Sequence, residues 1–257
     1  MLLWFERRIS LRDTDMFNTD FHEGLVGVRY GKFRARLASA AICLLFGSSA
    51  AIAECDDRPG PGVDWAGCSK ELLMLEGSDL SGANLDHAIL SGTVFRSAKL
   101  EGANLQRAEL VRTAFPDADL SGANLGKALA SRADFSGARL VKAKLVKAEF
   151  QRVSFAGADL SGADLSDGDF DRNDFTGAKL AGADFTGAIL PRSLFSGATL
   201  SGTSLTGAFL YKSRFEGVDL SAVKGLTQDQ LDQTCGDQAT KLPTGLSAPV
   251  HWPCGDD

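Results

Sequence analysis

From Leu75 to Leu220, every fifth residue is Leu or Phe, with Ala130 as the one exception. Two residues before each of these central positions lies a small or short side chain, apart from Leu73 and Asn173. A helix advances about 100° per residue, so a five-residue period would spread the apolar side chains around the whole helix. In a strand, alternate residues share one face, but here three other residues then intervene. The pattern therefore predicts a chain that turns after every five residues and winds into a coil, with the central and small side chains inside.

The residue types at the central positions indicate how many sides each coil has. Steps of twenty residues give one column that is all Leu and one that is all Phe, whereas steps of fifteen or twenty-five mix the two residue types. The Leu column comprises Leu80, Leu100, Leu120, Leu140, Leu160, Leu180, Leu200 and Leu220. The Phe column comprises Phe95, Phe115, Phe135, Phe155, Phe175, Phe195 and Phe215. We therefore expect four sides per coil, with residues twenty apart stacked at about 4.8 Å. Ala130 should leave a gap in its column, which Phe150 of the next coil can fill.

The five-residue units resemble those of the pentapeptide-repeat family. The units are Ser-Gly-Ala-Asn-Leu at 81–85 and 121–125, Ser-Gly-Ala-Asp-Leu at 161–165 and Thr-Gly-Ala-Lys-Leu at 176–180. The resemblance covers residues 76–222 and implies an all-β fold, a right-handed quadrilateral β-helix. At twenty residues per circuit, this stretch would form about seven coils.

We expect four segments in the chain, because the open ends of a solenoid expose backbone edges that need caps. They are an N-terminal extension with a signal peptide (1–53), an N-terminal cap (54–75), the β-helix (76–222) and a C-terminal cap with a short helix (223–257). The apolar run Leu72-Leu73-Met74-Leu75 is suited to cover the first coil.

The C-terminal cap contains the sequence of a helix start. Thr227 and Gln230 have the spacing of a capping box, and Leu226 and Leu231 are placed as a hydrophobic staple. We predict a short helix over residues 228–234.

Basic residues precede an apolar run near the N-terminus. The run extends from Leu37 to Phe46 and is followed by small residues that end in Ala51-Ile52-Ala53. This order is typical of a secretory signal, and the run is short for a membrane span. We expect cleavage after Ala53, no transmembrane segment in the mature chain, and a periplasmic or secreted protein. The alternatives are a buried apolar helix and a lipoprotein anchor on Cys55; Glu54 is not the small residue that usually precedes such an anchor.

Four cysteines follow the predicted signal, in one pair on each side of the repeats. An even number in an exported chain indicates disulfides, and four cysteines allow three connectivities. Because each pair is close in sequence, we predict disulfides between Cys55 and Cys68 and between Cys235 and Cys254. Metal binding is the rival interpretation, but His251 is the one histidine near either pair.

The residues suggest a protein that binds rather than catalyses. Beyond residue 53 there are 20 Lys and Arg against 28 Asp and Glu, a mildly acidic balance that is ordinary for solubility. The histidines are His22, His87 and His251, while Ser and Asp recur as parts of the repeat. Because there is no phosphate loop or zinc-type cysteine motif, we predict no catalytic residues, no metal site and no cofactor.

Two outward rows at twenty-residue spacing differ in charge. The alternating row comprises Asp79, Lys99, Asp119, Arg139, Asp159 and Lys179. Its neighbours attract by roughly 0.8 kcal/mol in water, which favours a structural role. The cationic row comprises Arg112, Arg132, Arg152, Arg172, Arg192 and Lys212.

Two interpretations of the cationic row stay open. In the first, nearby acids pair with it locally; these are Glu109, Asp134, Glu149, Asp169 and Asp174. In the second, it binds a linear polyanion, since guanidinium groups suit phosphates and carboxylates. We hypothesise an anionic component of the cell envelope, such as lipopolysaccharide phosphate or an acidic glycan.

Other functions would use other surfaces. The family resemblance implies a DNA mimic that interacts with DNA gyrase in the cytoplasm. However, residues 76–222 carry 18 acids against 16 bases, and the predicted signal directs the chain elsewhere. A passive protein-interaction scaffold could use the outward column with Ile89, Leu129, Ile189 and Phe209, and a dimer could form through an end cap. No nucleic-acid partner is favoured.

Overall fold

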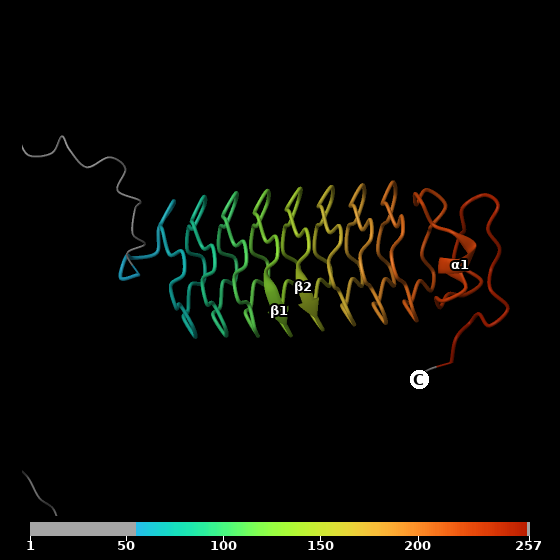
Figure 1. Cartoon of the computed structure of the whole chain (residues 1–257), viewed down its shortest axis with the longest axis horizontal. Helices are drawn as coiled ribbons and strands as arrows, with labels where there is room; N and C mark the ends of the chain where they lie inside the picture. The colour runs from blue at the N-terminus through green and yellow to red at the C-terminus, as the bar shows by residue number, and fades with distance from the viewer. Residues whose placement is uncertain (1–54, 256–257) are drawn as a thin grey trace, which may run out of the picture. The chain divides into compact units, whose positions relative to one another are not determined.

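The computed structural model describes residues 55–255, so the predicted signal and its cleavage site lie outside the described residues. The described chain forms successive coils that stack side by side in residue order (Figure 1). Two short strands, β1 (Leu129–Ser131) and β2 (Glu149–Gln151), and one helix, α1 (Gln228–Leu231), are its regular elements. Within this part of the chain, no helix has the length and hydropathy needed to cross a bilayer.

The coils are held in register by a parallel hydrogen-bond ladder. Bridges join residues twenty apart, from Asp64 and Asn84 near one end to Ser204 and Lys224 near the other. Between β1 and β2 the pairing extends over three residues, and Ala130 lies opposite Phe150. The predicted circuit of twenty residues is confirmed.

The interior consists of the columns that the sequence indicates. The stacked rings of the Phe column have centroids 4.6 to 5.3 Å apart. Members of the Leu column are buried as well. Inner hydroxyls bond to carbonyls of the preceding coil, as Thr113 does to Leu90 at 2.9 Å. Stacking identical side chains thus fills a narrow core and leaves few polar groups without partners.

Phe150 lies opposite Ala130 on the next coil. Ala130 is buried, and the Phe150 ring lies 5.8 Å from Phe135 and 6.1 Å from Phe155. Phe150 thus belongs to the aromatic cluster beside Ala130, and its filling of the gap stays a prediction.

The ladder begins before the predicted start of the repeats. Trp65 and Cys68 are buried, and Asp64 pairs with Asn84. The prediction that the run from residue 72 to 75 covers the first coil is wrong, because Leu72 and Met74 are 80% and 72% exposed. These residues are part of a coil, in which inward and outward side chains alternate. Leu72 and Met74 occupy outward positions.

The ladder also continues into the C-terminal cap. Helix α1 has the predicted capping box, in which the Thr227 side chain accepts from Gln230 N and the Gln230 side chain accepts from Thr227 N. It ends at Leu231 rather than at residue 234, because the chain returns to the coils: Cys235 N donates to Ser213 O at 2.8 Å. The next bridge, from Asp219 to Lys241, spans twenty-two residues.

Both predicted disulfides are present. Cys55 is joined to Cys68, and Cys235 to Cys254, with Cα atoms 5.5 Å apart in each pair. One disulfide lies at each end of the ladder, where a coil has a neighbour on one side only.

The alternating row forms ion pairs between coils, as its signs predict. Arg139 lies 3.8 Å from Asp119, and Lys179 lies 3.7 Å from Asp159. Farther along, Lys241 contacts Asp219 at 3.1 Å. Hydrogen bonds from the Ser221 hydroxyl and amide, followed by Lys241, lower the pKa of Asp219 from its ordinary 3.8 to about 2.

We predict that Phe135→Ala lowers the free energy of unfolding by about 3–5 kcal/mol, because it leaves a cavity in the stacked column. Phe209→Ala, at an outward position that is 47% exposed, should change it by less than about 1 kcal/mol. Urea unfolding checks both variants. Equal losses would contradict the assignment of inner and outer positions.

Acid unfolding tests the Asp219 contacts. Since folding lowers the pKa of Asp219, its charged form adds stability above about pH 4, and this contribution disappears as the pH falls toward 2. Asp219→Asn should therefore be less stable than the original chain at pH 7, and this difference should shrink as the pH falls from about 4 toward 2. Ser221→Ala should move this loss to higher pH. A stability difference for Asp219→Asn that does not depend on pH would contradict the role of the carboxylate.

Candidate anion-binding site

The cationic row occupies a corner of the coils where the backbone is left-handed. Its six residues have φ values of 54° to 57°, and Gly92 has the same place on an earlier coil at 70°. A side chain in this conformation costs about 1–2 kcal/mol, whereas Gly adopts it freely. Each cation therefore stands where glycine would be less strained.

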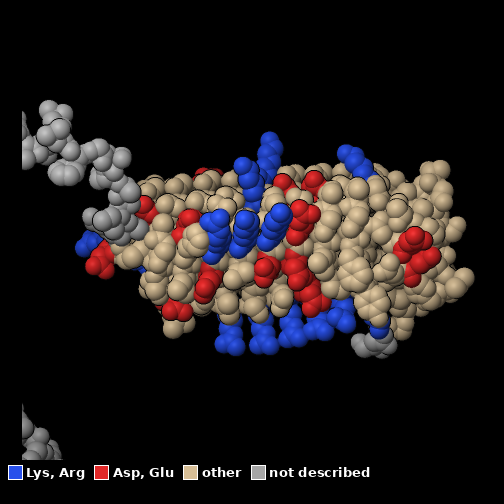
Figure 2. All heavy atoms as spheres, in the orientation of Figure 1, with Lys and Arg blue, Asp and Glu red and all other residues tan. Residues whose placement is uncertain are grey.

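The ladder holds the backbone at this corner. Arg112 N donates to Ser131 O at 2.9 Å, Arg132 N to Gln151 O at 3.0 Å, and Arg152 N to Asp171 O at 2.9 Å. The side chains start one coil apart, about 4.8 Å. Figure 2 shows a row of Lys and Arg side chains projecting along the lower edge of the coils.

The local acids do not neutralise the first half of the row. Among residues 55–255, no ion pair joins Arg112, Arg132 or Arg152 to an acid. Three of the proposed acids instead accept turn amides, as Asp134 does from Ser136 N at 2.9 Å. Asp169 likewise accepts a hydrogen bond from Asp171 N, and Asp174 accepts one from Thr176 N.

An acid that sequence reasoning missed contacts the second half of the row. Asp171 lies 4.0 Å from Arg172 and 3.7 Å from Arg192. Asp171 directly precedes Arg172 in the sequence, and this adjacency could have indicated that it lies beside the cationic row. Local pairing therefore reaches Arg172 and Arg192, through Asp171.

A groove runs along this corner. Its volume is about 390 Å³. Its lining residues are Val111, Arg112, Ser131, Arg132, Gln151, Arg152, Asp171 and Arg172. With four guanidinium groups and one carboxylate, the groove can receive an extended anion by charge and by hydrogen bonding.

The neighbouring corner carries a second, shorter set of cations that sequence reasoning missed. Arg107, Lys127 and Lys147 also have left-handed φ values, of 55° to 58°, and Asp167 ends the set. Counting in steps of twenty from Arg107 would have found it. Glu149 and Asp169 are backbone bridge partners in the outward column between the two corners. This face therefore carries acids between its two rows of cations.

The outward apolar column is interrupted, as the sequence indicates. Ile189 and Phe209 are bridge partners and are 44% and 47% exposed, but Asp169 and Glu149 precede them. Leu129 is exposed separately on an earlier coil. A passive scaffold that uses this column stays a prediction.

Comparisons with known proteins identify the repeat. The sequence matches a family model described as pentapeptide repeats, in eight copies over residues 75–115, 118–155, 154–190 and 192–222. A search of curated proteins found no match.

Several solved structures are similar to this chain. Full-length QnrB1, a plasmid-mediated fluoroquinolone resistance protein, is 17% identical over 70% of this chain and 91% of its own, with a TM-score of 0.46. HetL, a pentapeptide repeat protein involved in heterocyst differentiation regulation in the cyanobacterium Nostoc, is 24% identical over 72% and 92%, with a TM-score of 0.28. A pentapeptide repeat protein from the Arabidopsis thaliana thylakoid lumen is 28% identical over 49% and 80%, with a TM-score of 0.34. These similarities assign no activity or partner to this chain.

We predict that Arg152→Gly unfolds with a free energy up to about 1 kcal/mol higher than Arg152→Gln. Both variants remove the charge, so the difference reports the relief of the left-handed backbone, less the greater freedom of unfolded Gly. Urea unfolding of the two variants measures it. If the Gly variant is the less stable one, the strain assigned to this corner is contradicted.

Proposed function

The chain belongs to the pentapeptide-repeat family, and we propose that it uses a rigid β-helix to bind a linear polyanion along the cationic row. A right-handed helix of about seven coils over residues 76–222 and a purely non-enzymatic role are part of this proposal. The observation that carries it is the groove lined by four arginines, three of which have no ion pair among residues 55–255.

Charge repulsion supports a bound anion. Neighbouring cations at this spacing repel by roughly 0.8 kcal/mol in water, and their left-handed corners add strain. An anion that bridges successive guanidinium groups would offset the repulsion between them. The alternating row shows that the same scaffold can carry opposite charges on adjacent coils, as Arg139 and Asp119 do. Uniform charge in the cationic row is therefore not a requirement of the fold.

The regular spacing favours a polymer over a small ion. The row presents one cation per coil, about 4.8 Å apart. An extended chain of acidic sugars carries anionic groups at a comparable repeat and can lie along the groove with one group per arginine. We therefore propose an acidic glycan, or the phosphate-bearing part of a lipopolysaccharide, as the class of partner.

An exported location agrees with this partner. Disulfides such as Cys55–Cys68 and Cys235–Cys254 persist mainly in oxidising compartments. We propose that the chain is exported and acts in the periplasm or outside the cell, where such polymers are exposed.

We predict that the triple variant Arg112→Gln, Arg132→Gln and Arg152→Gln loses retention on immobilised polygalacturonate and on lipopolysaccharide. The original chain should bind at low salt and elute as salt rises, because exposed charge pairs are screened. The matched control is Lys99→Gln, Arg139→Gln and Lys179→Gln, which removes the same charge from the alternating row. The control should be retained. Equal retention of all three proteins would overturn the proposed function.

A further inference from the structure

The positive charge of one face is concentrated on three successive coils. On each coil the chain crosses this face from the second set of cations to the cationic row. The crossings with a positive excess are residues 107–112, 127–132 and 147–152, which together contain six Lys and Arg against two acids. Figure 2 shows a short row of basic side chains across this face, above the row along its lower edge. The two rows of cations therefore overlap on the same three coils.

The neighbouring coils limit this positive region on both sides. Residues 87–92 contain no Lys, Arg, Asp or Glu. Residues 167–172 contain three acids against one Arg. One of these acids, Asp171, pairs with both Arg172 and Arg192. The positive region is therefore three coils long, although the cationic row itself continues beyond it.

The cations of the three coils have no acid partner in the described chain. Among residues 55–255, no ion pair involves Arg107, Lys127 or Lys147, and the same holds for the three arginines on the other corner. All six residues are exposed. The two acids of the region, Glu109 and Glu149, form no ion pair with any described residue either. The excess of cations is therefore not neutralised within this part of the chain.

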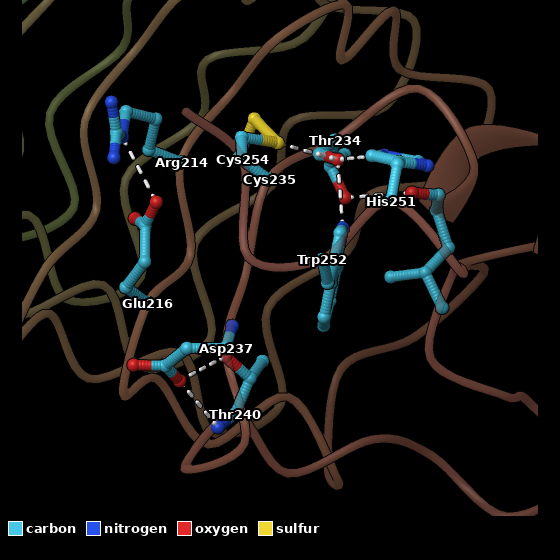
Figure 3. The surroundings of a disulfide bond; sticks show 10 residues. Arg214, Glu216, Thr234, Cys235, Asp237, Thr240, His251, Trp252 and Cys254 are labelled. Carbon is cyan, nitrogen blue, oxygen red and sulfur yellow. Dashed lines mark hydrogen bonds and ion pairs between the residues drawn. A yellow bond between two sulfur atoms is a disulfide. The ribbon is translucent and has the colours of Figure 1, made fainter. Parts of the chain in front are cut away.

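The cations near the C-terminal tail differ, because they have partners. Arg214 Nε donates to Glu216 at 2.9 Å, close to the C-terminal disulfide (Figure 3). Lys212 has an interaction partner as well. These two cations and Arg192, which is paired as described above, line a cavity of about 560 Å³ beside Tyr211. Because its cations are engaged, this cavity does not extend the positive region.

The uncharged residues of the groove offer hydrogen-bonding groups that a sugar can use. Ser131 and Gln151 line the groove, and each directly precedes an arginine of the cationic row. Neither side chain has a hydrogen-bond partner among residues 55–255. A hydroxyl and an amide can both donate and accept, as sugar hydroxyls do. The groove therefore combines groups for anions with groups for hydroxyls.

We propose that these three coils form a bounded site for a segment of acidic glycan about three units long, since successive cations are about 4.8 Å apart. One carboxylate of the glycan faces each of Arg112, Arg132 and Arg152. Sugar hydroxyls meet Ser131 and Gln151, and the second set of cations adds attraction at low salt. The choice of a glycan rests on the proposed function, whereas the length limit rests on the distribution of charge.

Asp171 sets the end of the bound segment. A fourth carboxylate would have to approach Asp171, which carries the same charge, or displace it from Arg172 and Arg192. Both cost free energy, so units beyond the third add little to binding. A longer polymer still binds, with three of its units on the site and the others in solvent.

Salt-dependent titration calorimetry with galacturonate oligomers of one, two, three and six units tests the length limit. The slope of log affinity against log salt concentration measures the number of ionic contacts. We expect this slope to steepen up to three units and to be the same for three and six units. A slope that steepens further from three to six units overturns the limit.

The variant Asp171→Asn should remove the limit. It frees Arg172 and Arg192, so the slope for six units should become steeper than the slope for three. The matched control is Asp174→Asn, which removes one charge from the same coil, keeps the ion pairs of Asp171 and should retain the original slopes. Equal slopes for the two oligomers in Asp171→Asn overturn the assigned role of Asp171.

An acidic peptide tests the choice of a sugar. A capped peptide of three glutamates carries as many carboxylates as the galacturonate trimer but no sugar hydroxyls, so it should bind about tenfold more weakly. Gln151→Ala should narrow this difference, because it removes a partner for a hydroxyl. Equal or tighter binding of the peptide to the original chain overturns the choice of a glycan.

Failure of the proposed function gives a different result. If neither the polymers nor the oligomers bind the original chain, the proposed function fails and the bounded site fails with it. If the polymers are retained but no oligomer binds, or the slope keeps steepening with length, the bounded site fails alone.

Discussion

The parallel backbone ladder with a period of twenty residues determines where each residue of the repeats lies. Each coil bonds to the next through amides and carbonyls such as Arg112 N and Ser131 O. A single side chain cannot change that register without breaking bonds on both adjacent coils. The ladder therefore converts distance along the sequence into position on the surface: residues twenty apart share a column, inside or outside.

The surface therefore consists of rows of residues twenty apart, and each row can differ in charge from the next. In the alternating row, opposite charges on adjacent coils pair across the ladder, as Lys179 and Asp159 do. In the cationic row, the same geometry stacks like charges and places them on left-handed corners, as at Arg132. The first arrangement lowers the energy of the folded chain, whereas the second raises it wherever no acid such as Asp171 contacts the cations. That contrast, rather than the overall net charge, distinguishes a structural row from a candidate binding site.

The sequence determines the interior more completely than the ends. Phe115 and Phe135 could be placed one above the other because repetition averages out local irregularities, and the Thr227–Gln230 capping box has a known local geometry. Leu72 and Met74 were misplaced because an apolar run was assumed to be buried, while the ladder continues through them and alternates them outward. The helix was predicted too long because local capping does not show where Cys235 rejoins the coils.

The candidate site was predictable in its cations but not in their surroundings. Spacing alone placed Arg112 and Arg132 in one row. The role of Asp171 and the cavity beside Tyr211 depend on side-chain directions and on a tail with no repeat, so they emerge from the three-dimensional structure. Repeats allow the columns to be predicted from the sequence. Contacts between a column and a segment without repeats can be identified only from the three-dimensional structure.

The stacking of residues twenty apart is tested by the distance between spin labels placed at Arg112 and Arg192 through cysteine substitutions. These positions are four circuits of twenty residues apart, so one stacked row predicts a narrow distribution near about 19 Å between the backbone sites. Labels at Arg112 and Gly197, on different corners, provide the off-row comparison. A broad distribution, or a distance from Arg112 to Arg192 well above 30 Å after allowance for the labels, would contradict the twenty-residue ladder.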